Sequence, residues 1–223
     1  MSEAKPEAAS GVAIILAFLA GFVDTAAFIH MSGLFVAHVT GNFVLLGAAL
    51  ATGGAVGEKG PEVLQLAALP IFFAAAMLTG ALAARLTARR GLAVILWSAS
   101  LLTLAVAGAS AWLGAGPWDA ASAVVLIAAM GMLNAAHRLN PAMGPPFALM
   151  TGNVAALAIR AAQVLHLAPH PEGPASGIEA KMLRAVIGFA LGCACGAAAQ
   201  VWLGLAAVGI PAVLLMARLA WRG

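Results

Sequence analysis

The sequence predicts an all-helical protein that crosses a membrane several times. Of its 223 residues, 63% are apolar and only 9% are charged, and the mean hydropathy is +1.02. A soluble domain carries about 25% charged and about 45–50% apolar residues. The apolar residues form long runs interrupted by Gly and Pro, which is typical of helices. A transmembrane barrel would need alternating strands rich in aromatic residues, and Tyr is absent.

Eight apolar segments stand out along the chain, and about 20 residues are needed to span the hydrocarbon core, with a working range of about 17–25. Most segments have this length, whereas the last is marginal and contains Pro211. The segments are Val12–Ile29, Phe35–Thr52, Val63–Ala84, Leu92–Leu113, Ala120–Ala136, Phe147–Leu167, Met182–Trp202 and Leu205–Ala220.

Loop charge favours one of two topologies, because basic residues gather on the cytoplasmic side. If all eight segments cross, seven basic residues fall inside and four outside. If Phe35–Thr52 and Phe147–Leu167 instead enter and return on the same side, only Lys59 lies outside and ten basic residues lie inside. We therefore expect six crossings and two re-entrant or broken segments, with both termini in the cytoplasm; a full crossing of those two segments stays open.

A short polar motif occurs twice, as Thr40-Gly41-Asn42 and as Thr151-Gly152-Asn153. Each copy follows a Gly-led helical stretch that carries one polar residue, Asp24 in the first half and Asn134 in the second. The offsets are 110 for Asp24 and Asn134 and 111 for the two threonines, which indicates a duplicated unit. With three crossings per unit the second copy is upside down, so we expect an inverted repeat with a shared site.

The repeat predicts one integral membrane domain made of two halves. Residues 1–10 are expected to be a disordered tail, residues 11–114 the first repeat and residues 115–223 the second. Two small-residue ladders match in register, since Gly80 and Gly192 lie 112 positions apart. Such ladders let helices approach closely in lipid, although each alone is also consistent with ordinary packing in an alanine-rich helix.

Asp24 is the only carboxylate within an apolar segment. A charge near the bilayer centre costs at least about 2.5–3.5 kcal/mol, so it is rarely without a role. One interpretation is a binding site for a substrate, ion or proton; the other is a structural ion pair or hydrogen bond between helices. Asn134, His137 and Arg138 share a helical face by their spacing, and we expect Asp24 to face it. Arg138 can equally reach out to the interface.

The Thr-Gly-Asn motif suits a break in a helix. Gly permits close backbone approach, while Thr and Asn satisfy the backbone groups that a break sets free. Non-helical backbone at membrane depth survives only where protein or a watery cavity covers it. We expect each motif at a helix start beside a cavity and include all six of its residues in the candidate site; an Asn clasp without a cavity is the alternative.

His30 and His38 flank the first of these segments and are candidates, with His137 and Arg138, for gating or proton relay. No His/Cys pattern with metal-ligand spacing occurs, and we expect neither a metal nor a cofactor. The sequence has no basic stripe with interleaved aromatic residues, so we do not expect it to bind nucleic acid.

Residues 21–42, GFVDTAAFIHMSGLFVAHVTGN, and 131–153, GMLNAAHRLNPAMGPPFALMTGN, resemble the YoaK family, bacterial inner-membrane proteins of unknown function. The resemblance covers roughly residues 11–220. It implies a bacterial inner-membrane location and no established activity.

From the residues, the leading hypothesis is a small transporter or channel for a small polar solute or anion, with the site at the two Thr-Gly-Asn motifs near Asp24. The alternative is a membrane-embedded assembly protein in which these polar groups only lock helices together. We do not expect an enzyme, because no nucleophile and base stand at a useful spacing. Expected partners are membrane lipids, the solute or an ion, and a second copy of the chain.

Overall fold

The computed structural model describes residues 6–52, 62–143, 146–169 and 177–221. These residues contain no strand and form α-helices with two short 3-10 helices. The helices are α1 (Pro6–His30), α2 (Gly41–Thr52), α3 (Glu62–Ala84), α4 (Ala88–Leu113), α5 (Asp119–Leu139), η1 (Pro141–Met143), α6 (Met150–Val164), α7 (Ile178–Leu203), η2 (Gly204–Val208) and α8 (Gly209–Ala220). The predicted outer charge Lys59 lies outside the described residues.

Five stretches of the described chain are long and apolar enough to cross a membrane. Four coincide with α1, α3, α4 and α5; the fifth, Ile178–Ala220, has 43 residues and contains both α7 and α8. The two helices are separated by a bend at Gly204, whose φ of 58° favours glycine. α2 has 12 residues and α6 has 15, which is below the length of a single span. The protein thus has the architecture of a polytopic helical membrane protein.

Several helix boundaries differ from the predicted segments, and three of the differences concern the expected tail and the two Thr-Gly-Asn segments. α1 already begins at Pro6, inside the stretch expected to be a tail, because Pro is favoured at the first helical position and Ala8 and Ala9 are strong helix formers. α2 begins at Gly41 and α6 at Met150, later than the apolar runs suggested. Hydrophobicity marks membrane depth but does not separate helix from irregular backbone at that depth.

The bundle is held by close contacts between helices from different halves of the chain. α1 packs most extensively on α7, and α3 packs on α5. Gly188, Gly192 and Gly196 line one side of α7 and are buried. A Cβ atom at Gly192 would overlap the carbonyl oxygen of Phe18 on α1. The predicted close approach of helices at this ladder is confirmed, because only glycine admits the neighbouring backbone here.

The relative directions of three helices follow from contacts at their ends. Nε2 of His30, the last residue of α1, lies 3.4 Å from Oδ1 of Asp119 at the start of α5. Nδ1 of His30 lies 3.3 Å from Nε2 of Gln200 near the end of α7. At the other end, Gly188 of α7 faces Ile14 of α1. α1 and α7 are therefore parallel, and α5 is antiparallel to both.

The chain between α1 and α3 leaves the bundle end and returns to it. Ser32 and Gly33 have φ values of 52° and 107° and turn the chain. Residues 34–40 then run back along α1 until they reach Asp24, six residues before the end of α1, or about 9 Å at about 1.5 Å per residue. Nε2 of Gln65, near the start of α3, donates to the carbonyl oxygen of Gly33 (2.7 Å). α1 thus ends, and α3 begins, at the same end of the bundle.

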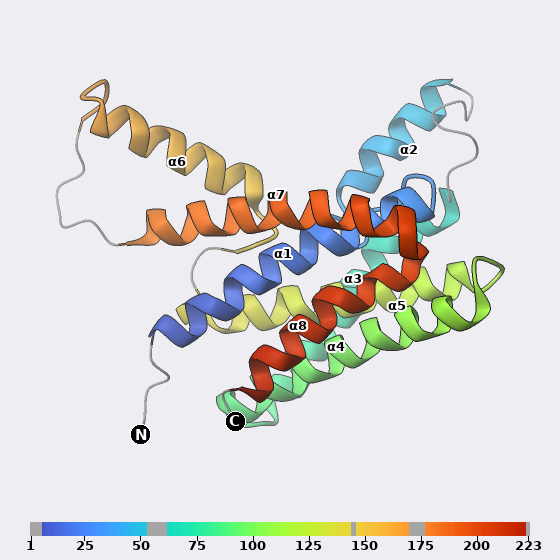
Figure 1. Ribbon diagram of the computed structural model, residues 1–223. Coiled ribbons are helices and arrows are strands. Elements are labelled where there is room, and N and C mark those ends of the chain that lie inside the picture. Colours follow the sequence, from blue (N-terminus) through green and yellow to red (C-terminus); the bar gives the residue numbers. More distant parts are fainter. Residues whose placement is uncertain (1–5, 53–61, 144–145, 170–176, 222–223) are drawn as a thin grey trace.

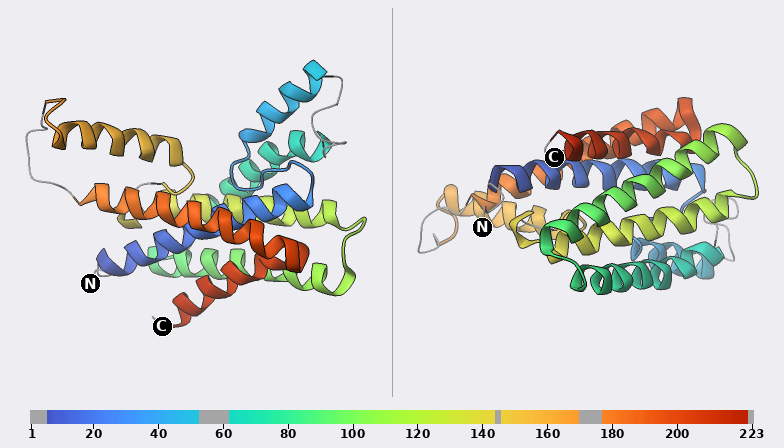
Figure 2. Two further views of the ribbon diagram at one scale, coloured as in Figure 1. Left: turned by 45° about the horizontal axis from the view of Figure 1, so that its top comes forward. Right: turned by 90° about the horizontal axis from the view of Figure 1, so that it is seen from below.

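α6 has the same relation to the opposite end of the bundle. α5 ends where α7 begins, and α6 lies between them in the chain. Nε of Arg160 on α6 lies 3.6 Å from Oε1 of Glu179 in the first turn of α7. In Figure 1, α2 and α6 project from the same side of the bundle, α6 towards one end and α2 towards the other. The second orientation in Figure 2, left, shows the same two projecting helices.

The first prediction compares two glycines at matching ladder positions. Gly192→Ala places a methyl group against the Phe18 carbonyl, so we expect the free energy of unfolding to fall by about 1–3 kcal/mol. A Cβ at Gly80 meets nothing within 4 Å, so Gly80→Ala should be neutral or stabilising by up to about 1 kcal/mol. The measurement is thermal unfolding of each purified variant in the same detergent. Equal losses in both variants would contradict the assigned α1–α7 contact.

Candidate functional site

The carboxylate of Asp24 holds the returning backbone of the first loop, residues 31–40. Its Oδ1 accepts hydrogen bonds from the backbone N–H groups of Val36 and Ala37, both at 2.7 Å. Its Oδ2 accepts the N–H of His38 at 3.0 Å and lies 2.6 Å from Nδ1 of the same residue. Asp24 is only 3% exposed. Because an ionised carboxylate only accepts hydrogen bonds, this set of donors fits the charged form.

The ring of His38 is oriented by this contact. With Nδ1 donating to Asp24, Nε2 is left as the acceptor of the neutral ring. Nε2 is buried and has no hydrogen-bond partner among the described residues. The ring edge packs on Phe189 of α7, with ring centroids 5.1 Å apart. The ring of His38 is therefore held in one orientation, with Nδ1 at Asp24 and Nε2 without a partner among the described residues.

The two motif asparagines clamp their own loops. The amide of Asn42 accepts the N–H of Phe35 and donates to its carbonyl oxygen, both at 2.9 Å. Nδ2 of Asn153 donates to the carbonyl oxygen of Pro146 at 3.3 Å. All three bonds join residues seven positions apart. The motifs stand at or beside the starts of α2 and α6, as predicted, and their asparagine side chains satisfy backbone that has left the helical pattern.

A cavity of about 480 Å³ opens between the first loop and a second loop, the residues 146–149 that precede α6. We call it the large cavity; its walls come from α3, α5, residues 37–40 and residues 146–149. Its polar side chains are His38, Thr40, Asn134 and Arg138, and none of the described lining residues is acidic. Arg138 is exposed, which places it at the mouth. The cavity thus combines an apolar wall with a few convergent polar groups, as ligand sites do.

A second cavity, of about 300 Å³, lies between α1, α7 and the first loop. This small cavity is lined by Asp24, Thr25, Phe28, Phe35, His38, Phe189 and Cys193. His38 lines both cavities. The imidazole of His38 therefore contacts the buried carboxylate of Asp24 and also lines the large cavity.

Not all predicted site residues meet. His30 belongs to a separate polar cluster with Asp119 and Gln200 at the bundle end. His137 is buried and packs edge-on against Phe147, with centroids 5.3 Å apart. Thr151 is exposed and Gly152 borders open space, whereas Gly41 packs under the ring of Phe35.

The hydrogen bonds of Asp24 and Asn134 do not join these two residues, in contrast to the expected contact of Asp24 with the Asn134 face. Asp24 bonds to residues 36–38, while Nδ2 of Asn134 donates to the carbonyl oxygen of Met130 in its own helix (3.0 Å). The two residues line different cavities. Sequence reasoning missed the pairing of Asp24 with His38, which are fourteen residues apart. The turn at Ser32-Gly33 is the signal that the chain comes back along α1. Within the described chain, no group of three His, Cys, Asp or Glu residues is placed to hold a metal ion.

The second prediction tests the asparagine clamps. Asn42→Ala leaves one donor and one acceptor of Phe35 without partners, whereas Asn153→Ala leaves a single carbonyl. At about 1–3 kcal/mol for each unsatisfied buried group, the loss of unfolding free energy should be about twice as large for Asn42→Ala. Denaturation curves of both variants, measured side by side, check this. A larger loss for Asn153→Ala would be inconsistent with the observed bonds.

The third prediction concerns Asp24. Asp24→Asn keeps an oxygen for the N–H groups of Val36 and Ala37 but turns an amide N–H₂ towards His38. Asp24→Leu removes every acceptor and leaves three buried N–H groups unpaired, at about 1–3 kcal/mol each. We expect Asp24→Asn to fold with reduced stability and Asp24→Leu to be far less stable. Fluorescence-detected size exclusion after heating reports both; indistinguishable losses would argue against the carboxylate's role in holding the loop.

Comparison with known proteins gives a family without a described activity. No curated protein and no solved structure matches the chain. A family model described as a protein of unknown function, DUF1275, matches residues 12–221. The match agrees with the expected membership of an uncharacterised family, while the YoaK name stays a resemblance. The chain belongs to the DUF1275 family of proteins of unknown function.

Proposed function

We propose that the two halves form an inverted repeat with six crossings and two re-entrant segments. The helix contacts support this, because they occur in matching pairs. α1 with α7 corresponds to α5 with α3, and α1 with α8 corresponds to α5 with α4. Each short helix also follows a loop that turns back into the bundle, from opposite ends in the two halves.

The two cavities support the same relation. Asp24, Phe28, Phe35 and His38 of the small cavity correspond, at offsets of 110 or 111, to Asn134, Arg138, Pro146 and Leu149 of the large cavity. A pair of related cavities at interrupted segments is the usual place of the substrate site in transporters with inverted repeats.

On this frame, we infer that the protein is a transporter or channel for a small anion, with its site in the large cavity. The observation that carries the proposal is the lining of this cavity, which holds one arginine, one amide and one hydroxyl but no described acidic residue. A guanidinium is always charged and donates in a planar fork that matches oxyanions. An anion reaching Arg138 also lies in the cavity whose wall carries His38.

His38 and Asp24 are proposed to provide the coupling or gating step. The open Nε2 position of His38 takes up a proton, and the Asp24 carboxylate stabilises the resulting imidazolium. The positive charge then formed at the cavity wall favours an anion in the cavity. This role needs no cofactor and makes the protein a transport protein rather than an enzyme.

A structural role is the second candidate, favoured by one observation. The polar atoms of Asp24 and Asn42 already form hydrogen bonds with the first loop. The same bonds are expected in an assembly protein whose polar groups only hold the fold. Under that hypothesis the cavity carries no solute.

The proposed location is the bacterial inner membrane with both termini in the cytoplasm. The arginines after α3 and at the start of α4, together with Arg138, Arg184 and Arg218, stand at one end of the bundle, which is the end expected to be cytoplasmic.

The fourth prediction tests transport directly. Purified protein in liposomes should pass small anions, with chloride, nitrate and acetate as probes, faster than the neutral solutes urea and glycerol. Arg138→Gln should lower anion flux roughly tenfold, the effect of losing about 1.4 kcal/mol of interaction. Arg184→Gln is the matched control, because Arg184 is exposed on α7 and outside the cavity. Flux is followed by stopped-flow light scattering.

The comparison also includes folded Asp24→Asn, which should lose flux while keeping its elution volume. Equal flux of anions and neutral solutes, or equal flux of the two arginine variants, would refute the anion site. Absence of flux from folded wild-type protein for every probe would favour the assembly role.

A further inference from the structure

A third hollow lies in the angle between α1, α7 and α8 and shares no lining residue with the two cavities above. It has a volume of about 480 Å³ and is lined mainly by apolar side chains, among them Ile14, Phe18, Leu191 and Leu214. We call it the α8 groove. Two members of its lining are polar or amphipathic: Arg218 in the last turn of α8 and Trp221, the C-cap residue three positions later. Residues at this spacing share one face of a helix.

Arg218 is half-buried beside this groove. Its guanidinium rests against α1 at Gly11, where a Cβ atom would stand 3.0 Å from Nη2. Gly11 therefore leaves the space that the guanidinium fills. No described residue forms a hydrogen bond or ion pair with Arg218. A fixed positive charge thus lies at an apolar groove without a counter-ion from the described chain.

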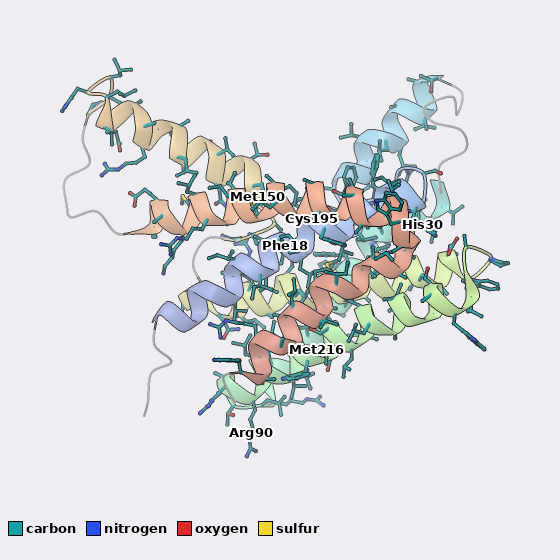
Figure 3. The ribbon with its side chains drawn as sticks, in the orientation of Figure 1. Phe18, His30, Arg90, Met150, Cys195 and Met216 are labelled. Carbon is teal, nitrogen blue, oxygen red and sulfur yellow. The ribbon has the colours of Figure 1, made fainter. Side chains whose placement is uncertain are left out.

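The level of Arg218 along the bundle is that of a membrane interface. α8 ends near Gly11 at the start of α1, and the labelled Arg90 in Figure 3 stands at this same end of the bundle. His30 is labelled at the opposite end. Trp221 is 90% exposed, and tryptophan at a helix end is typical of the headgroup region.

We propose that the α8 groove binds one anionic phospholipid. An acyl chain occupies the apolar part between α1, α7 and α8, and the phosphate pairs with Arg218, with Trp221 packing at headgroup level. A basic residue at a groove between membrane helices on the cytoplasmic side matches such headgroups. A net negative lipid is favoured over a zwitterionic one, because it supplies the missing counter-charge without a second cation.

The test uses native mass spectrometry of the full chain in detergent with phosphatidylglycerol and phosphatidylcholine of the same acyl chains. Wild type should retain phosphatidylglycerol preferentially. Arg218→Gln should lower that retention roughly fivefold, the contribution of one basic residue near an anionic lipid surface. Arg90→Gln is the control, since Arg90 is exposed at the same end of the bundle and does not line the groove.

A second variant keeps the charge and fills the groove. Leu191 is 56% exposed, so Leu191→Trp can be accommodated and should reduce retention with Arg218 intact. Equal retention by Arg218→Gln and Arg90→Gln, or retention unaffected by Leu191→Trp, overturns the proposal. Displacement of the lipid by inorganic phosphate alone also overturns it, because the acyl chain would then contribute nothing. Anion flux is not part of this readout, so the two proposals fail independently.

Discussion

The candidate site depends on hydrogen bonds from side chains to backbone groups that are not helical and lie inside the bundle. Each unpaired N–H or C=O group there costs several kcal/mol, because no lipid group can replace water. Asp24 removes three N–H groups of residues 36–38 from this cost, and Asn42 removes both backbone groups of Phe35. The loop can then stay inside the bundle. The position of His38, and with it the wall between the two cavities, follows from that anchoring.

The second half meets the same constraint with different residues. In the proposed repeat, Pro146 corresponds to Phe35, and proline has no N–H to satisfy. Asn153 therefore needs only to donate to the Pro146 carbonyl, whereas Asn42 must also accept. Asn134, in the place of Asp24, bonds within its own helix. Under the proposed repeat, Asn134 takes the place of the carboxylate, and none of the described residues that line the large cavity is acidic.

Much of the fold could be predicted from the sequence, because composition and motif spacing can be read directly from the order of the residues. Composition indicates the membrane class, and the offset of the two Thr-Gly-Asn motifs indicates where the short helices begin. The pairing of Asp24 with His38 could not be predicted, because it depends on how far the chain doubles back after Ser32. Both α2 and the loop before it are rich in apolar residues, so hydrophobicity does not show where the loop ends and the helix begins. Likewise, the role of Arg138 depends on whether a cavity opens beside it, and no local pattern encodes that.

The divergence of the two halves has an electrostatic consequence for the proposed transport. Asp24 stands on the wall of the small cavity only, and Arg138 on that of the large cavity only. A symmetric pair of carboxylates would repel an anion from both cavities, and a symmetric pair of arginines would hold it too tightly to release. With the carboxylate on the small cavity and the guanidinium on the large one, neither situation arises. In the proposed mechanism, a proton taken up by His38 would strengthen anion binding in the large cavity while the new charge stays paired with Asp24. In the proposed mechanism, His38 would link the two cavities because its imidazole lines both of them.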